Sequence, residues 1–275
     1  MPKLIIIPGA GSSDLNWLDQ LVYFEKQNFK SYFLEYKADL HENMSDCAFH
    51  LAEELSTLTE SSRSLIIAHS MGAMLLLKAL SETKVSEKLK ISLSNSEIFL
   101  VQCPPNANPK LLKSLKSFRG LLSTGMHLHQ PLKKIVRENL EKYKLKFLEK
   151  KELSKNAGNE LIQWSLQEHI KDLVWILSAM HISAWGTQPS IFKNLINYYE
   201  EWHYEKITEK DLSHLHDLNI HLTVSNSDIF CSKSDSLKLA EKLNANIKHF
   251  DWTFHNPMHF PWSKNDFNQW ILKHQ

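Results

Sequence analysis

Residues 68–72 of the sequence, Ala-His-Ser-Met-Gly, have the spacing of an activated serine. The serine, Ser70, follows the apolar run 65–68 and precedes a stretch with helical spacing, 73–80. A sharp strand-to-helix turn exposes the serine hydroxyl, and small residues two positions before and after it let strand and helix approach closely. The motif therefore favours Ser70 as a nucleophile over the simpler interpretation, a serine that caps a helix.

A serine hydroxyl needs a histidine to take its proton and a carboxylate to orient that histidine. Asp228 closely follows the apolar run 222–224, while Asp235 lies farther on, beside the expected start of a helix. Two histidines late in the chain, His255 and His259, are each followed two residues later by proline. These four residues are the candidates for the acid and the base.

Other histidines do not have the spacing of a metal site. The pairs 127/129 and 214/216 have neither a nearby cysteine nor a carboxylate at the spacing of zinc ligands. The sequence also lacks the Gly-Lys-Ser/Thr ending of a phosphate-binding loop after its first glycines. We therefore expect neither a metal nor a cofactor.

Strands and helices alternate in the parts of the chain that must position these residues. The expected strands are 4–7, 31–36, 65–68, 98–103, 220–224 and 247–252, and the expected helices are 15–26, 47–58, 73–80, 236–243 and 265–273, the last capped by Ser263. Such alternation predicts an α/β fold with a mostly parallel sheet that helices cover on both faces.

The middle of the chain differs from its two ends. From about residue 105 to residue 210 the spacing is helical, with little strand signal. We expect one core built from 1–104 and 211–275, with a helical insertion at 105–210 after the fourth strand. A length of 275 residues with 43% hydrophobic side chains is typical of a globular protein and excludes disordered, collagen-like and coiled-coil classes.

The order of these motifs resembles the α/β-hydrolase family, of the serine esterase and thioesterase type. The resemblance covers the core and rests on the turn 8–11 (Pro-Gly-Ala-Gly), Ser70, Asp228 and a histidine near the end of the chain. Three features depart from the family. Ala68 and Pro8 stand where glycine and histidine are common, and the antiparallel strands that usually open the fold are absent from the pattern.

The resemblance implies a role for each candidate residue. It assigns Asp228 as the acid and the backbone N–H groups of Ala10 and Met71 as the oxyanion hole. The family's usual spacing between acid and base favours His255, which lies 27 residues after Asp228. The local sequence His-Phe-Pro-Trp resembles the family's ending and favours His259, which we take as the base with His255 as the alternative.

The insertion has the position of a lid over Ser70. Its aromatic residues either line an acyl pocket or form the lid's own core, and for a single tryptophan we favour the core; they are Trp164, Trp175, Trp185, Phe192 and Tyr198. Between 105 and 155 there are 13 lysines and arginines against 4 glutamates, although the whole chain has a net charge of +1. This basic stretch is either a solvated surface or a dock for an acidic acyl carrier protein. Its residues include Lys110, Lys113, Lys116, Arg119, Lys133, Lys134 and Arg137.

These features predict a serine hydrolase that cleaves a carboxylic ester through an acyl-enzyme. A thioesterase acting on carrier-protein or coenzyme A substrates is the alternative with the same machinery, and a non-hydrolytic small-molecule receptor is the alternative of another class. The near-neutral chain is not expected to bind nucleic acid. No apolar stretch is long enough to span a membrane, and the short run 4–7 does not have the form of a signal peptide, so we expect a cytoplasmic protein. Three widely spaced cysteines fit a reducing compartment.

Overall fold

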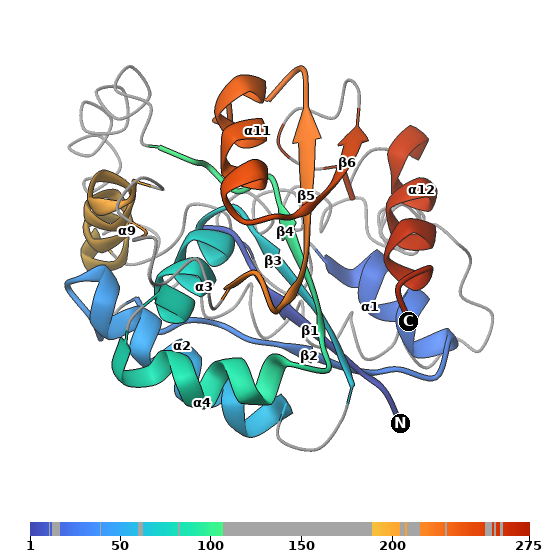
Figure 1. Cartoon of the computed structure of the whole chain (residues 1–275), viewed down its shortest axis with the longest axis horizontal. Helices are drawn as coiled ribbons and strands as arrows, with labels where there is room; N and C mark the ends of the chain where they lie inside the picture. Colours follow the sequence, from blue (N-terminus) through green and yellow to red (C-terminus); the bar gives the residue numbers. More distant parts are fainter. Residues whose placement is uncertain are drawn as a thin grey trace, which may run out of the picture.

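Figure 1 shows the computed structural model of the chain. The structure describes residues 1–10, 12, 17–38, 40–59, 63–81, 83–106, 189–203, 207, 215–228, 230–250, 255, 257–258 and 261–275. Most of the predicted insertion therefore lies outside the described residues, and the 105–210 lid boundaries stay a prediction.

Six parallel strands form one sheet in the order β2-β1-β3-β4-β5-β6. The central strands are buried along nearly their whole length, as expected when helices cover both faces of a parallel sheet. The edge strands β2 and β6 are more exposed. The strand bounds are β1 Lys3–Ile7, β2 Lys30–Phe33, β3 Ser64–His69, β4 Glu97–Val101, β5 Asn219–Ser225 and β6 Asn246–Phe250.

Helices cover the two faces of the sheet unequally. The larger cluster of buried side chains packs the sheet against α2, α3, α4, α9 and α11, and the smaller one packs the other face against α1 and α12 (Figure 1). The helix bounds are α1 Leu18–Lys26, α2 Met44–Thr59, α3 Met71–Ser81, α4 Thr83–Leu93, α9 Pro189–Glu201, α11 Lys233–Lys242 and α12 Pro261–Leu272.

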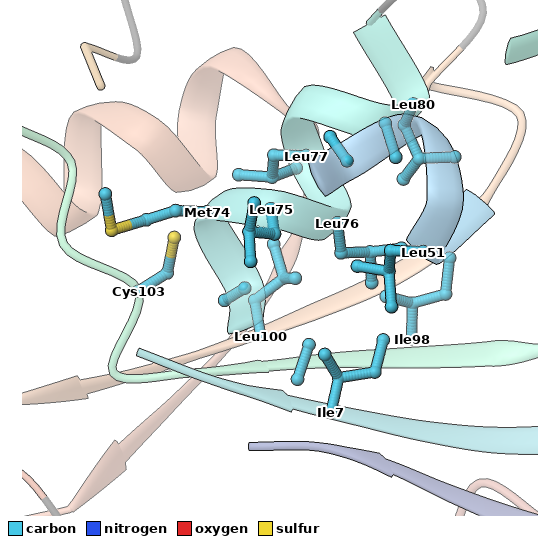
Figure 2. Close-up of a cluster of buried hydrophobic side chains, with 14 of the residues drawn as sticks. Ile7, Leu51, Met74, Leu75, Leu76, Leu77, Leu80, Ile98, Leu100 and Cys103 are labelled. Atoms are coloured by element: carbon cyan, nitrogen blue, oxygen red, sulfur yellow. The ribbon is translucent and has the colours of Figure 1, made fainter. Parts of the chain in front are cut away.

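The helix that follows Ser70 is the most deeply buried of the chain's described helices. Nine of the eleven residues of α3 are buried, and apolar side chains of β1, β4 and α2 surround it (Figure 2). Figure 2 shows Leu75, Leu76 and Leu77 of α3 above Ile7, Ile98 and Leu100 of the strands. Burial of a leucine side chain contributes about 1.5–3 kcal/mol. The core thus fixes the turn that carries Ser70 from the helix side.

The predicted α/β fold is confirmed, with two local differences. Helix α4 is not among the predicted helices; its pattern is mostly polar, and its buried residues include Leu89 and Leu93. Ser263 was expected to cap the last helix, but α12 begins at Pro261, and the Ser263 hydroxyl donates to the Pro257 carbonyl instead. Proline is well suited to the first helical position because it has no N–H to leave unpaired.

One helix of the predicted insertion, α9, is bound to the core. The Asn194 side chain donates to the carbonyls of Ala38 and His41 at 2.8 and 3.0 Å, and the Trp202 indole donates to the Pro104 carbonyl at 2.6 Å. Tyr198 is fully buried in the larger cluster, so this aromatic residue belongs to the core between the sheet and its helices. The side chains of the other predicted lid aromatics, 164, 175, 185 and 192, lie outside the described residues. Among the described helices, none combines the length and the apolar character that crossing a membrane requires.

Candidate active site

Ser70 lies in a strained turn between β3 and α3. Its φ is +50°, a left-handed conformation that non-glycine residues adopt rarely. The Ser70 N–H donates to the Val101 carbonyl of β4 at 2.9 Å, and its carbonyl accepts the N–H groups of Ala73 and Met74 in the first turn of α3. The backbone is therefore held on both sides, which stabilises a conformation that costs on the order of 1–3 kcal/mol.

Two glycines allow the turn after β1 to approach this serine closely. A Cβ atom on Gly72 would lie 2.4 Å from the Pro8 carbonyl oxygen and 2.6 Å from that of Ile7. On Gly9 it would lie 2.7 Å from Nδ1 of His69. These distances explain why small residues surround the serine, as the motif predicted. Ala68, which replaces a more usual glycine, is fully buried within β3.

Asp228 occupies the loop that follows β5 at the same edge of the sheet. Its Oδ1 accepts the N–H groups of Phe230 and Cys231 at 2.8 and 3.1 Å, and its side chain is fully buried. Asp228 therefore stabilises the turn through Oδ1 and can still present its carboxylate charge to another side chain. Asp235, the competing candidate, lies in the exposed first turn of α11, where it bonds with Ser232 and faces Lys238.

The imidazole of His255 lies between Asp228 and Ser70. Its Nδ1 is 2.8 Å from Asp228 Oδ2 and 3.0 Å from Oδ1, and its Nε2 is 2.8 Å from the Ser70 Oγ. A carboxylate only accepts, so Nδ1–H donates to Asp228, and Nε2 is left to accept the serine hydroxyl proton. The structure thus brings together three residues from loops that are far apart in the sequence.

This geometry changes the preference between the two histidines. Local resemblance predicts His259 as the base, with His255 as the alternative. His255 occupies the bridging position, while His259 lies outside the described residues. The spacing from Asp228 favours the histidine that lies between the two residues, whereas the His-Phe-Pro-Trp resemblance favours His259, whose role as the base stays a prediction.

A second imidazole, that of His69, supports the loop that carries His255. The Nε2–H of His69 donates to the backbone carbonyl of His255 at 3.0 Å, and the two rings are 5.1 Å apart. His69 is buried and packs edge-on against Trp17. Residue types alone do not predict this role, because position 69 is the variable position of the serine motif.

The ends of β4 and β5 support the aspartate loop. Gln102 has a φ of +48°, and its N–H donates to the Thr223 hydroxyl at 2.8 Å. Its carbonyl accepts the Cys231 thiol at 3.3 Å. Burial, together with the nearby Asp228 charge, raises the pKa of the Cys231 thiol well above its ordinary value, so it stays protonated and is not a nucleophile.

The predicted oxyanion donors are the N–H groups of Met71 and Ala10. Met71 is the first residue of α3, and the N–H groups of a helix's first turn have no partner within the helix. The positive end of the helix dipole therefore lies beside the Ser70 hydroxyl. Ala10 is exposed in the turn after β1, close in sequence to Gly9, which contacts the serine turn.

Among the residues that the structure describes, two groups of side chains have the donor types of metal ligands. One is Asp228, Cys231 and His255, whose atoms already form the hydrogen bonds described above. The other is Glu97, His221 and His274, at the opposite ends of the strands from Ser70. In each group the ligand-type atoms lie within 4.8 Å of one another.

Comparison of the sequence with models of protein families gives no match, and comparison with curated proteins gives none. Solved structures, in contrast, are similar along nearly the whole chain. A carboxylesterase from the ammonia-oxidizing thaumarchaeon Nitrososphaera gargenis has a TM-score of 0.59 and 14% identity, covering 98% of this chain and 89% of its own. The enol-lactonase from Burkholderia xenovorans LB400 has a TM-score of 0.62 and 11% identity, covering 99% and 90%.

A third similar structure is described as an α/β hydrolase. MGS-M2, an α/β hydrolase from a deep-sea metagenome library of the Medee basin, has a TM-score of 0.58 and 14% identity, covering 99% of this chain and 88% of its own. Together with the six-stranded parallel sheet and the serine turn between β3 and α3, these likenesses show that the chain has the α/β-hydrolase fold. The fold expected from the sequence is confirmed.

Proposed function

We propose that the protein is a serine hydrolase that cleaves carboxylic esters through an acyl-enzyme. The observation that carries the proposal is the hydrogen-bonded series from Asp228 through His255 to Ser70, with both contacts of the imidazole at 2.8 Å. This arrangement is the one that activates a serine hydroxyl. Two of the similar structures are a carboxylesterase and an enol-lactonase, and both names describe ester-cleaving chemistry.

In the proposed first half-reaction, the Ser70 Oγ attacks the ester carbonyl while His255 Nε2 accepts the hydroxyl proton. The C–O bond to the leaving alcohol then breaks, and His255 returns the proton to the leaving oxygen. A water molecule repeats the sequence in the second half-reaction and releases the acid and the serine. Asp228 stays ionised throughout and stabilises the imidazolium that forms.

Negative charge on the carbonyl oxygen develops next to the start of α3 in this mechanism. We propose the N–H groups of Met71 and Ala10 as the donors to that oxygen. Loss of one such donor costs about 2.7–4 kcal/mol in other hydrolases. Side-chain substitution at either position leaves the backbone N–H in place. The activity of such variants therefore measures the effect of the side chain's shape on the site and not the loss of a donor.

The substrate is proposed from the sequence alone. We propose an acyl ester presented by an acidic carrier protein, of the kind cleaved by the pimeloyl-carrier-protein methyl ester esterase of biotin synthesis. The support is the short core, the helical character of 105–210 and the basic stretch within it, which lies outside the described residues. A carrier-protein thioester would use the same three residues.

Hydrolysis of nitrophenyl esters of increasing acyl length tests the activity. We expect turnover by the wild-type protein and a loss of about 10⁶-fold in kcat for Ser70→Ala, as measured for such a serine elsewhere. Circular dichroism of the variant should match the wild type because the hydroxyl adds little to packing. A wild-type protein that binds these esters without turnover would instead support the non-hydrolytic receptor.

A further inference from the structure

A second cluster of polar side chains lies at the end of the sheet opposite to Ser70. Glu97 begins β4, and His221 lies near the start of β5, whereas Ser70 follows the last residue of β3. His274 follows α12 near the end of the chain. We call these three residues the distal cluster. The candidate active site uses none of them.

The members of the distal cluster contact one another directly. The Nε2–H of His221 donates to Glu97 Oε2 at 2.8 Å, and the ring centroids of His221 and His274 are 4.0 Å apart. One ligand-type atom from each of the three side chains lies within 4.8 Å of the other two. Two imidazoles and one carboxylate are donors that Zn²⁺ prefers, at about 2.0–2.2 Å each.

His221 is an unusual residue for its place in the sheet. Along β5, Ile220, Leu222 and Val224 face the larger apolar cluster, and the alternate residues face α12. His221 is only 2% exposed, stacks on Phe99 at 4.8 Å and lies edge-on to Trp270. An apolar residue would fill this position at no desolvation cost, whereas a buried polar group is unfavourable unless it has partners.

The hydrogen bonds of His221 do not satisfy the ring completely. Within the part of the chain that the structure describes, its buried Nδ1 has no hydrogen-bond partner. Such buried atoms without a partner are few in native proteins. Nε2, not Nδ1, is the nitrogen that faces Glu97, so an ion shared by the three side chains replaces the proton at Nε2, and that proton moves to Nδ1. The buried imidazole beside a carboxylate and a second imidazole is the observation that points to a ligand.

Neighbouring groups hold Glu97 through Oε1, while Oε2 accepts the Nε2–H of His221. Arg63 lies 3.6 Å from Glu97 Oε1 and donates to the His274 carbonyl at 3.0 Å, and the Asn219 amide donates to the same Oε1 at 3.4 Å. Oε2 therefore faces His221. The positive Arg63 competes for the carboxylate charge, so we expect weaker binding than in sites with four protein ligands.

From this geometry we propose that Glu97, His221 and His274 bind one Zn²⁺ ion, with a water molecule as the fourth ligand. His274 is partly exposed, so solvent reaches the cluster from that side. The ion would join β4, β5 and the segment after α12, which otherwise meet through apolar packing around Phe99 and Trp270. Binding to the folded state alone raises the free energy of unfolding in proportion to the logarithm of the zinc concentration.

Zinc titration of tag-free, chelator-treated protein tests the proposal. We expect the wild type to bind one more equivalent of Zn²⁺ than His274→Ala or Glu97→Gln, with a zinc-dependent rise in Tm that both variants lose. His249→Ala, which removes an exposed histidine on β6, is the matched control and should retain both effects. Equal binding by wild type and His274→Ala, or no binding by wild type, would overturn the proposal.

X-ray absorption at the zinc edge provides a test that needs no variant. The proposed site has only nitrogen and oxygen ligands, at about 2.0–2.2 Å. The candidate active site also gathers metal-ligand types, but it includes the Cys231 thiol. A sulfur shell near 2.3 Å would place the ion there and contradict the proposal. Neither measurement depends on ester hydrolysis, so the result is independent of the proposed function.

Discussion

The residue directly before the proposed nucleophile holds the backbone of the proposed base. The Nε2–H of His69 donates to the His255 carbonyl at 3.0 Å, and the next residue along the chain, Ser70, bonds to the His255 ring at 2.8 Å. Two consecutive residues of one strand end thus fix both the main chain and the ring of His255. This arrangement limits the freedom of a loop that starts and ends far from β3 in the sequence.

His69→Phe should therefore slow catalysis more than it affects the fold. It keeps a buried ring but removes the donor to the His255 carbonyl, so the base is less well oriented. We expect kcat to fall about 10- to 100-fold, the size of effect that a misplacement of about 1 Å produces. His69→Gln retains a donor and should recover part of the rate. A loss of stability with unchanged kcat would mean that His69 acts only in packing.

Asp228→Asn separates the charge of this residue from its turn. The amide oxygen can still accept the N–H groups of Phe230 and Cys231, so the loop should be retained. Without the carboxylate the histidine tautomer is wrong, and kcat should fall about 10⁴-fold. Asp235→Asn is the matched control on α11 and should leave the rate near wild type. Near-normal activity of Asp228→Asn would contradict its role.

Gly72→Ala should destabilise the protein through one steric contact. The new Cβ atom would lie 2.4 Å from the Pro8 carbonyl oxygen, and both groups belong to backbone that the core holds in place. We expect a loss of about 3 kcal/mol in the free energy of unfolding, at the upper end for overpacking. Urea denaturation measures it. Ala68→Gly is the control and should cost less, because it creates no clash.

The carrier-protein proposal predicts a salt effect that depends on the substrate. Hydrolysis of a carrier-bound ester should fall steeply as salt increases, because charges are screened beyond about 8–10 Å near physiological ionic strength. Reversal of Lys110, Lys113 and Lys116 to glutamate should raise KM for the carrier substrate alone. A small neutral ester is the internal control. Equal effects on both substrates would leave the basic stretch as a solvated surface.

Local sequence was informative where function depends on neighbouring residues. The Ser70 motif and the position of Asp228 after an apolar strand were visible, because each needs only a strand end and the residues beside it. The choice between His255 and His259 was visible only in the spacing from Asp228 and not in the local sequence, because it depends on contacts between distant parts of the chain. Gln20 of α1 bonds to the Met258 carbonyl at 2.9 Å, 238 residues away. A contact of that separation leaves no local pattern.

The distal cluster also could not be predicted from the sequence, because its members are far apart along the chain. Glu97 and His221 meet only because β4 and β5 are neighbours in the sheet, with Glu97 opposite Asn219 in the register. His274 joins them through the packing of α12. Sequence patterns show only histidine pairs close together, such as 214 and 216, which lack other ligands at the spacing of a zinc site.

Labelling of Ser70 by a fluorophosphonate is the most direct test of the central claim, that His255 activates Ser70. The modified peptide is identified by mass spectrometry, and the labelling rate is compared for the wild type, Ser70→Ala, His255→Ala and His259→Ala. We predict rapid labelling at Ser70 in the wild type and in His259→Ala, and none in the other two variants, all four proteins having matching circular dichroism. Rapid labelling of His255→Ala together with loss in His259→Ala would contradict the account and assign the base to His259.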